Sequence, residues 1–237
     1  MTYLKGMIGG LVFVAAWVGG RQHDPPSQTR YMEIDPAVHS TAENYKVLTN
    51  LVVPRPIAWV TSVSGDGVVN LAPFSFFNAV GSDPLFVVIS IGRRDDGEPK
   101  DTLANILSGR DFVVNLVTEE LLAAMNVSAV DFPPDQSELI PAELEVTASS
   151  RIAAPRLTKA QASLECKLHD TLALGSNTLV IGEVVMFHVA DRLLGPRLHI
   201  EGFAPIGRLG SPSMYCRTTD RFDLPRISYS GWEEGKR

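Results

Sequence analysis

The sequence predicts a mostly β protein, an antiparallel barrel with a few α-helices. Several apolar runs have the length of β-strands, the segments between neighbouring runs are short and turn-like, and only two segments are convincing helices. Short turns join antiparallel neighbours, whereas a doubly wound parallel sheet needs a long crossover between its strands. These observations favour a closed antiparallel sheet in a single domain.

A β-hairpin is expected first along the chain. Residues 57–62 are rich in β-branched and aromatic side chains, and a second strand-like run covers residues 68–77. Gly65-Asp66-Gly67 lies between them, and Asp-Gly is a hairpin signal because the turn needs residues that tolerate positive φ. Three more strands are expected at residues 85–91, 112–117 and 178–189, which are apolar or alternating runs.

Two helices are expected between these strands. One covers residues 102–107, with Asp101 as a cap and Gly109 as a stop. The other covers residues 121–125 and follows Thr118-Glu119-Glu120, where a cap and two acids suit the positive end of a helix. Residues 131–155 are rich in Pro and acids and predict a long ordered excursion over the surface.

Composition excludes several classes of protein. The 237 residues include 21 Lys and Arg against 27 Asp and Glu, which gives a net charge of −6. Because no basic excess can neutralise phosphates, binding of nucleic acid by simple electrostatics is not expected. The two cysteines, Cys166 and Cys216, cannot form a disulfide framework and are expected to be buried thiols.

Residues 1–31 are set apart from the fold. Residues 7–20 form an uncharged apolar run, shorter than the ~20 residues that cross a bilayer, and residues 21–30 are polar and contain Pro25-Pro26. Three interpretations stay open: an upstream extension with Met32 as the natural start, an export signal, or a membrane anchor. We expect one folded domain over residues 32–237 and a cytoplasmic location, with export or membrane association as the alternatives.

Common catalytic and metal-binding motifs are incomplete or missing. Gly65-Asp66-Gly67 imitates the start of a dinucleotide fingerprint, but it leads into a strand where the fingerprint opens a helix. Neither a Gly-x-Ser-x-Gly elbow nor a His-Glu-x-x-His pair occurs. Cys166 and His169 are three residues apart, so on a strand they face opposite sides and are not expected to bind zinc.

Residues 70–78 are unusually polar for a core strand. Asn is depleted in strands and Pro73 removes a ladder donor, so this stretch is expected at an edge or mouth of the barrel. The small Ala72 and Ser75 would let a flat ligand approach the backbone, and the Ser75 hydroxyl offers it a hydrogen bond. Thr61 and Ser62 lie across the hairpin. The alternative is an edge strand with incidental polar residues and two ordinary strand formers.

A second candidate site lies at the start of the helix over residues 102–107. Helix N-termini present unpaired N–H groups and a partial positive charge, which attract phosphate. Lys100 adds a full charge and Thr102 a hydroxyl, whereas Asp101 would repel a phosphate unless its carboxylate caps the helix. A solvated loop with an ordinary cap is the alternative.

Residues 43–223 resemble the flavin reductase-like, FMN-binding split-barrel family, which includes the flavoredoxins. The resemblance rests on an ordered set of pieces: residues 54–62 (Pro-Arg-Pro-Ile-Ala-Trp-Val-Thr-Ser), 70–78, Lys100-Asp101-Thr102 with Asn105, 112–115, Glu165-Cys166, 182–184, and 207–210 with Tyr215.

The resemblance implies a homodimer of split barrels that binds FMN near the subunit interface. It also implies which residues contact the isoalloxazine and ribityl parts of FMN: Thr61, Ser62, Asn70, Ala72, Pro73, Ser75 and Phe76. Arg55 and Pro56 are expected close by, and Lys100, Asp101 and Thr102 around the phosphate. The phosphate position agrees with the argument from the helix start.

The function that the resemblance implies first is an NAD(P)H-dependent flavin reductase. Hydride would pass from NADH or NADPH to N5 of the flavin, and the reduced flavin would serve a partner oxygenase or ferric iron. The alternatives are a flavoredoxin-like electron carrier that holds FMN tightly and a flavin-binding module without an efficient redox partner. Because the flavin carries the redox chemistry, no side chain is expected to act as acid, base or nucleophile.

Overall fold

The computed structural model describes residues 31–235, and the expectations for residues 1–30 lie outside them. Two units are found, Met1–Ser40 and Thr41–Arg237. The first contains the 3-10 helix η1 (Pro36–Val38), which begins after Asp35, whose carboxylate accepts a hydrogen bond from the Ala37 N–H at 2.9 Å. The second contains all the other described elements. None of the described helices is long and apolar enough to cross a membrane.

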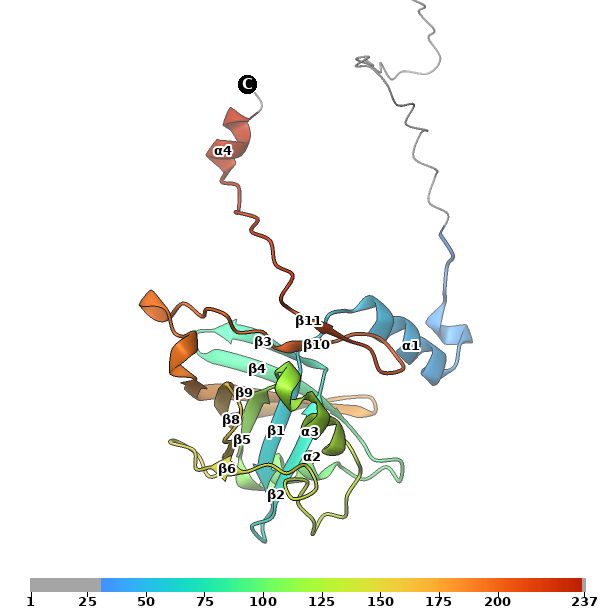
Figure 1. Cartoon of the computed structure of the whole chain (residues 1–237). Helices are drawn as coiled ribbons and strands as arrows, with labels where there is room; N and C mark the ends of the chain where they lie inside the picture. The colour runs from blue at the N-terminus through green and yellow to red at the C-terminus, as the bar shows by residue number, and fades with distance from the viewer. Residues whose placement is uncertain (1–30, 236–237) are drawn as a thin grey trace, which may run out of the picture. The chain divides into compact units, whose positions relative to one another are not determined.

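Seven antiparallel strands form the main sheet of the second unit, in the order β2-β1-β5-β8-β9-β4-β3 (Figure 1). They are β1 (Ala58–Val63), β2 (Val69–Phe74), β3 (Phe77–Ser82), β4 (Leu85–Gly92), β5 (Asp111–Leu116), β8 (Ala162–Leu174) and β9 (Asn177–Val189). The prediction of a mostly β, antiparallel fold is confirmed. The expected hairpin is β1 and β2, in which Ser62 pairs with Asn70 and Val63 with Val69.

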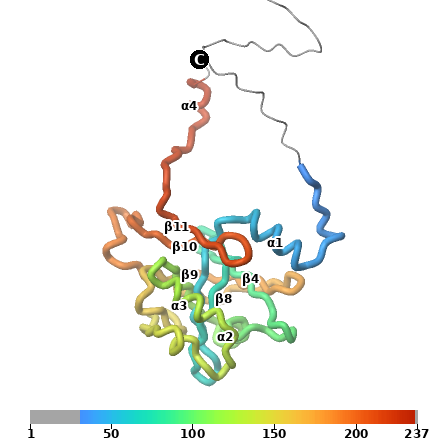
Figure 2. Tube along the Cα trace, turned by 45° about the vertical axis from the view of Figure 1, so that its right-hand side comes forward, coloured from blue at the N-terminus to red at the C-terminus, as the bar shows by residue number. Residues whose placement is uncertain are grey.

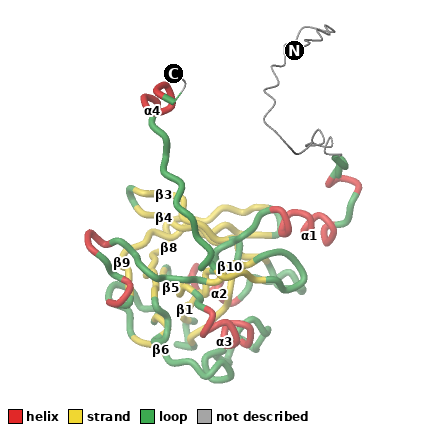
Figure 3. Tube along the Cα trace, turned by 45° about the horizontal axis from the view of Figure 1, so that its top comes forward, coloured by secondary structure: helices red, strands yellow, loops and turns green. Residues whose placement is uncertain are grey.

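The two edge strands of this sheet, β2 and β3, follow one another in the chain with only Ser75 and Phe76 between them. The Ser90 N–H of β4 donates to the Phe76 carbonyl at 2.8 Å and holds this link beside β4. A chain that passes from one edge to the other in two residues requires the sheet to curl until its edges meet. Figure 3 shows the strands gathered in a barrel with α1 and α3 outside it.

The prediction of one continuous strand over residues 68–77 was wrong at this link. Pro73 lacks the N–H that a neighbouring strand would need, so β2 has no strand on its outer side and ends at Phe74. The chain then bends and enters the opposite edge as β3. The strong β-forming character of Phe76 and Phe77 concealed this bend in the sequence.

Both faces of β1 are buried, which explains its almost continuous apolar run. Ala58 and Val60 point into the barrel interior and pack in one cluster with Phe112. Ile57 and Trp59 belong to a second cluster on the outer side, which also contains Leu157. The alternation follows the two-residue period of a strand.

Gly182 on β9 is needed for packing inside the barrel. A Cβ atom at this position would lie 2.5 Å from Cζ of Phe112, far inside van der Waals contact. The Phe112 ring, which is fully buried, therefore occupies the space that any other residue at position 182 would fill.

Two short ribbons and several helices complete the unit. The ribbons pair β6 (Val146–Thr147) with β7 (Arg156–Leu157) and β10 (Ile206–Arg208) with β11 (Tyr215–Arg217). The helices are α1 (Thr41–Leu51), α2 (Asp101–Gly109), α3 (Leu122–Val127) and α4 (Tyr229–Glu234), with 3-10 helices η2 (Glu119–Leu121), η3 (Asp191–Leu193) and η4 (Pro196–Leu198). Apart from β6, residues 131–155 are irregular, as expected for an excursion.

Two long elements were missed by the sequence prediction. Strand β8 carries Glu165, Lys167, His169 and Asp170, and this density of polar residues concealed a strand that pairs with β5 and β9. Helix α1 buries only Thr49, so its sequence shows little of the apolar periodicity that marks a packed helix.

Both expected helix caps need correction. Helix α2 begins at Asp101, with Lys100 in the N-cap position and no side-chain cap bond. The second helical stretch begins at Glu119, before the expected start at Leu121, as η2 followed by α3, and the hydroxyl of Thr118 makes no cap bond. At neither helix start does the side chain of the N-cap residue accept a hydrogen bond from the first N–H groups of the helix.

The cysteines are both free. Cys166 is fully buried inside the barrel, as expected, and this burial raises the pKa of its thiol strongly. Cys216 is only half-buried, because β11 lies in a two-stranded ribbon outside the main sheet. Within the described part of the chain, no group of His, Cys, Asp and Glu side chains is arranged to hold a metal ion.

Asn115 provides a test of how the excursion is attached to the barrel. Its buried amide donates to the Trp59 carbonyl at 3.0 Å and accepts from the Leu157 N–H at 2.9 Å and the Ser163 hydroxyl at 2.9 Å. We expect Asn115→Ala to lower the free energy of unfolding by about 2–4 kcal/mol, because it leaves buried groups unpaired. Urea unfolding followed by circular dichroism measures this loss.

Asn177→Ala is the matched control, since this half-buried amide donates to the half-buried Ser90 hydroxyl at 2.9 Å and accepts from the exposed Ser176 hydroxyl at 3.2 Å, so its removal leaves no fully buried group unpaired. Its expected loss is about 1 kcal/mol. Equal losses in the two variants would contradict the role given to Asn115.

Candidate functional site

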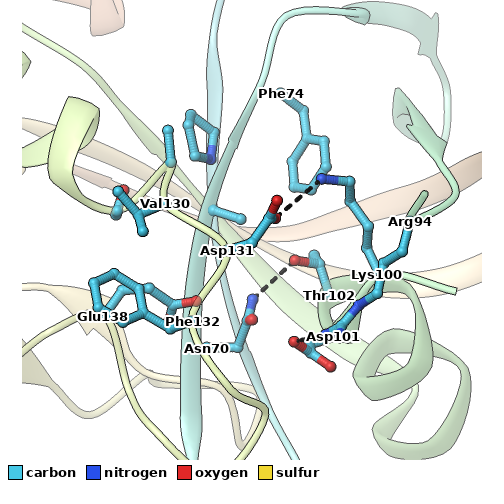
Figure 4. A pocket seen from close by; sticks show the side chains of 14 residues that line it. Asn70, Phe74, Arg94, Lys100, Asp101, Thr102, Val130, Asp131, Phe132 and Glu138 are labelled. Atoms are coloured by element: carbon cyan, nitrogen blue, oxygen red, sulfur yellow. Dashed lines mark hydrogen bonds and ion pairs between the residues drawn. The ribbon is translucent and has the colours of Figure 1, made fainter. Parts of the chain in front are cut away.

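A pocket lies where the start of α2 faces the free edge of β2 (Figure 4). We call it the α2 pocket. Its cavity volume is about 90 Å³, and its empty space is about 510 Å³ when the open mouth is counted. It is lined by residues of β2, of the α2 start and of the segment after α3: Asn70, Ala72, Pro73, Phe74, Arg94, Lys100, Asp101, Thr102, Ser128, Ala129, Val130, Asp131, Phe132 and Glu138.

The α2 start presents the groups that favour an anion. Lys100 stands in the N-cap position, and the first N–H groups of a helix have no partner within the helix. The Thr102 hydroxyl accepts a hydrogen bond from the Asn70 amide at 2.8 Å, which joins α2 to β2 across the pocket. Because the Thr102 oxygen acts as acceptor in this bond, its O–H can donate a hydrogen bond to a bound group.

Asp101 is held by an ion pair and not by a cap. Its carboxylate contacts the Arg94 guanidinium, which neutralises its charge. Lys100 has a looser partner, since its Nζ lies 3.7 Å from Oδ1 of Asp131, a side chain that is 93% exposed. A phosphate that enters the pocket can therefore displace Asp131 and pair with Lys100.

Glu138 closes the opposite wall of the α2 pocket. Its carboxylate accepts a hydrogen bond from the Leu71 N–H at 2.8 Å, and Ser137 donates to the Val69 carbonyl at 2.6 Å. These side chains cover the edge of β2 that no strand pairs with. Burial raises the pKa of Glu138, and the charge of Asp101 raises it further, although the bond from Leu71 opposes both effects.

The segment after α3 is anchored to the barrel by Trp59. The indole N–H of this fully buried side chain donates to the Ser128 hydroxyl at 2.8 Å, and Ser128 in turn donates to the Met125 carbonyl at 2.9 Å. The pocket wall at residues 128–132 is therefore fixed to β1.

Arg55 lies beside the expected site residue Ser75, with Nε 3.4 Å from the Ser75 hydroxyl, and its closeness to a cofactor stays a prediction. Its guanidinium donates to the carbonyls of Thr49 at 2.6 Å, Val52 at 2.7 Å and Leu209 at 2.9 Å. Figure 2 shows α1 beside the loop between β10 and β11, which these bonds join. Burial lowers the pKa of Arg55, and the carbonyl acceptors compensate the buried charge.

The remaining expected residues divide between neighbouring pockets and the sheet. Arg55, Pro56, Ser75 and Phe76 line a pocket below α1, and Pro73 and Ser75 also line a third pocket. Asn70, Ala72, Pro73, Lys100, Asp101 and Thr102 are brought together in the α2 pocket, as the sequence indicated.

Thr61 and Ser62 line none of the described pockets and are fully buried. Thr61 donates to the Pro155 carbonyl at 2.5 Å, and Ser62 accepts from the Asn105 amide at 3.2 Å. These bonds give both hydroxyls a structural role, and their contact with a ligand stays a prediction.

The sequence prediction missed the wall formed by residues 128–132 and Glu138. The signal that could have found it is the acid-rich composition of residues 131–155, which we assigned to the outer surface. The long-range bonds from Leu71 to Glu138 and from Ser137 to Val69 bring this segment to β2.

Comparison with known proteins places most of the chain in one family. Residues 50–219 match the model of the flavin reductase like domain. Nitrilotriacetate monooxygenase component B from Bacillus cereus is 37% identical, with a TM-score of 0.79 over 83% of this chain and 100% of that one. A 2-nitrobenzoate 2-nitroreductase from Pseudomonas fluorescens is 36% identical, with a TM-score of 0.77 over 84% and 98%.

The split-barrel fold is confirmed by a further solved structure. A flavin reductase with a split barrel domain from Shewanella frigidimarina covers 83% of this chain and 100% of its own, with a TM-score of 0.71. At 19% identity this likeness concerns the fold alone.

Glu138→Gln tests the buried carboxyl through the pH dependence of stability. Because the pKa of Glu138 is raised in the folded state, the folded chain keeps a proton that the unfolded chain releases. Its contribution is therefore most favourable below the unfolded value of about 4.3 and is lost as pH rises through the folded pKa. As pH rises through the folded pKa of Glu138, the free energy of unfolding of the wild type should therefore decrease relative to that of Glu138→Gln.

Glu119→Gln is the control with the opposite sign. The bond from Arg217 lowers the pKa of the exposed Glu119, so the wild type should gain stability relative to this variant as pH rises from acid to neutral. Urea titrations at several pH values measure both differences. Parallel profiles for the wild type and Glu138→Gln would show that Glu138 titrates normally.

Proposed function

The chain belongs to the flavin reductase-like domain family, and on this premise we propose that it binds FMN and reduces it with NADH or NADPH. The observation that carries the proposal is the α2 pocket, in which the helix start with Lys100 meets Ala72 and Pro73 of β2 at one sheet edge. FMN has two matching parts, a dianionic phosphate and a flat ring.

The residues of the helix start fit the phosphate. Lys100 supplies a charge, the first turn of α2 supplies N–H groups, and Thr102 supplies a hydroxyl proton. Asp101, which would repel the phosphate, is neutralised by Arg94. The Glu138 carboxylate on the other wall accepts the hydrogen bond from the Leu71 N–H.

The residues of β2 and its link to β3 fit the ring. Ala72 and Pro73 present little side-chain volume, so a flat ring can approach the backbone of the edge strand. Ser75 offers a hydroxyl, and Phe74 and Phe76 offer aromatic faces for stacking. Arg55 and Pro56 hold this wall in place, since Arg55 is bonded on three sides.

The bound flavin would supply the redox chemistry, by accepting hydride at N5 from the nicotinamide. The chain itself would bind and orient the flavin and would shield one face of it, with Lys100 and Thr102 toward the phosphate and Ser75 toward the ring. Since no proton transfer by a side chain is needed, we assign no catalytic residue.

The role in the cell follows from the same proposal. We place the protein in the cytoplasm, where nicotinamide donors occur, as a homodimer that passes reduced flavin to an acceptor. The similarity to nitrilotriacetate monooxygenase component B supports an oxygenase as that acceptor.

The first test is the visible spectrum of the purified chain with FMN, followed by anaerobic addition of NADH and of NADPH. Rapid bleaching of the flavin bands by either donor is the expected result. Bands that persist would contradict reduction by nicotinamide and favour an electron carrier fed by another protein. A chain that takes up no FMN would contradict flavin binding altogether.

The second test concerns the phosphate. Lys100→Met should weaken FMN binding by about tenfold or more, because a hydrogen bond to a charged group contributes about 1.5–3 kcal/mol. Riboflavin, which lacks the phosphate, should bind almost as before. Calorimetric titration of the apoprotein with each flavin measures the difference.

Lys167→Met is the matched control, because this exposed lysine lies on β8 outside the pocket. It should leave the affinities for FMN and riboflavin unchanged. Equal weakening of both flavins in Lys100→Met would place the phosphate elsewhere.

A further inference from the structure

A third pocket opens beside the α2 pocket, and we call it the Arg208 pocket. Its lining includes Tyr45, Phe74, Ser75, Arg208 and Tyr215. Phe74, Pro73 and Ala129 line both pockets, so the two share one wall. The cavity volume of the Arg208 pocket is about 220 Å³, and its empty space is about 580 Å³ when the open mouth is counted.

Among the residues that line this pocket, Arg208 is the one with a charged side chain. Neither Asp, Glu, Lys nor His lines it. Arg208 donates to the Pro212 carbonyl at 3.1 Å, and the described residues provide it with no salt bridge. The guanidinium of Arg55 is near enough to Arg208 for their charges to interact. In a chain of net charge −6, this pocket is locally positive and selects an anion.

Arg208 is held in position before any ligand arrives. It lies opposite Tyr215 in the ribbon of β10 and β11, and its guanidinium stacks on the Tyr215 ring at 4.6 Å. Its backbone exchanges two hydrogen bonds of 2.8 Å with that of Arg55, which fixes the ribbon to the barrel. A preorganised guanidinium loses little freedom on binding and presents a planar fork that matches a carboxylate.

The walls of the pocket select a flat, apolar group. Phe74, Tyr45 and Tyr215 line it together with aliphatic side chains, and aromatic walls favour stacking with a planar ring. A ligand that satisfies both features has an anionic group at one end and an aromatic ring at the other.

We propose that the Arg208 pocket binds a small aromatic carboxylate, with the carboxylate on the Arg208 guanidinium and the ring among the aromatic side chains. The binding itself does not require flavin. Its relevance to redox chemistry rests on the proposed function, because the shared wall would hold this ligand next to the bound flavin.

Calorimetric titration with benzoate and with benzamide tests the proposal, because the two probes share a ring and differ in charge. The wild type should bind benzoate about tenfold more tightly than benzamide, as expected for a charge-assisted hydrogen bond. Arg208→Gln should abolish this preference, and Arg208→Lys, which keeps the charge without the fork, should retain part of it. Tyr215→Leu should weaken both probes.

Arg217→Gln is the matched control, since Arg217 lies two residues away from Tyr215 on β11 and is paired with Glu119. It should leave the preference for benzoate intact. Equal binding of benzoate and benzamide by the wild type, or an unchanged preference in Arg208→Gln, would overturn the proposal. Thermal unfolding checks that the variants are folded.

Titrations of the chain with and without FMN separate this proposal from the proposed function. A chain that binds no FMN but prefers benzoate to benzamide would contradict flavin binding and support carboxylate binding in the Arg208 pocket. A chain that binds FMN but shows no preference for benzoate, whether FMN is present or absent, would support flavin binding and overturn the proposal for the Arg208 pocket.

Discussion

The link of Ser75 and Phe76 is the constraint on which the rest of the barrel depends. It joins the two edge strands of a seven-stranded sheet, so the sheet must close on itself. The Arg55 guanidinium stabilises this corner, with Nε 3.4 Å from the Ser75 hydroxyl and its centre 5.9 Å from the middle of the Phe76 ring. The same guanidinium holds the end of α1 and the loop after β10, so one buried charge fixes three segments around the proposed ring site.

Pro73 leaves the outer edge of β2 without a strand, and this free edge is where the α2 pocket forms. Exposed edges invite pairing with other chains, and here Ser137 and Glu138 occupy the edge with side-chain hydrogen bonds. The segment that protects the edge is therefore also a wall of the pocket. Stability of the edge and binding at the site depend on the same few residues.

The two pockets differ in how their charged side chains are paired. In the α2 pocket Arg94 pairs with Asp101 and the Leu71 N–H bonds the Glu138 carboxylate, so Lys100, whose partner Asp131 is 3.7 Å away, is the cation open to an anion. In the Arg208 pocket no acid is present at all. Two pockets that share a wall of β2 and each present a cationic side chain suit the proposed function, in which a second molecule would lie against a flavin.

The sequence by itself determined the hairpin of β1 and β2, the strands β4, β5 and β9, and the grouping of Asn70 and Ala72 with Lys100 and Thr102. These follow from two-residue periodicity, turn chemistry and helix-start chemistry, which act between near neighbours, and from the family resemblance. The tertiary structure alone decided that Asp101 pairs with Arg94, that Arg55 builds the wall, and that Glu138 reaches β2. Each of these depends on segments distant in the chain, whose meeting is set by barrel closure and not by local preference.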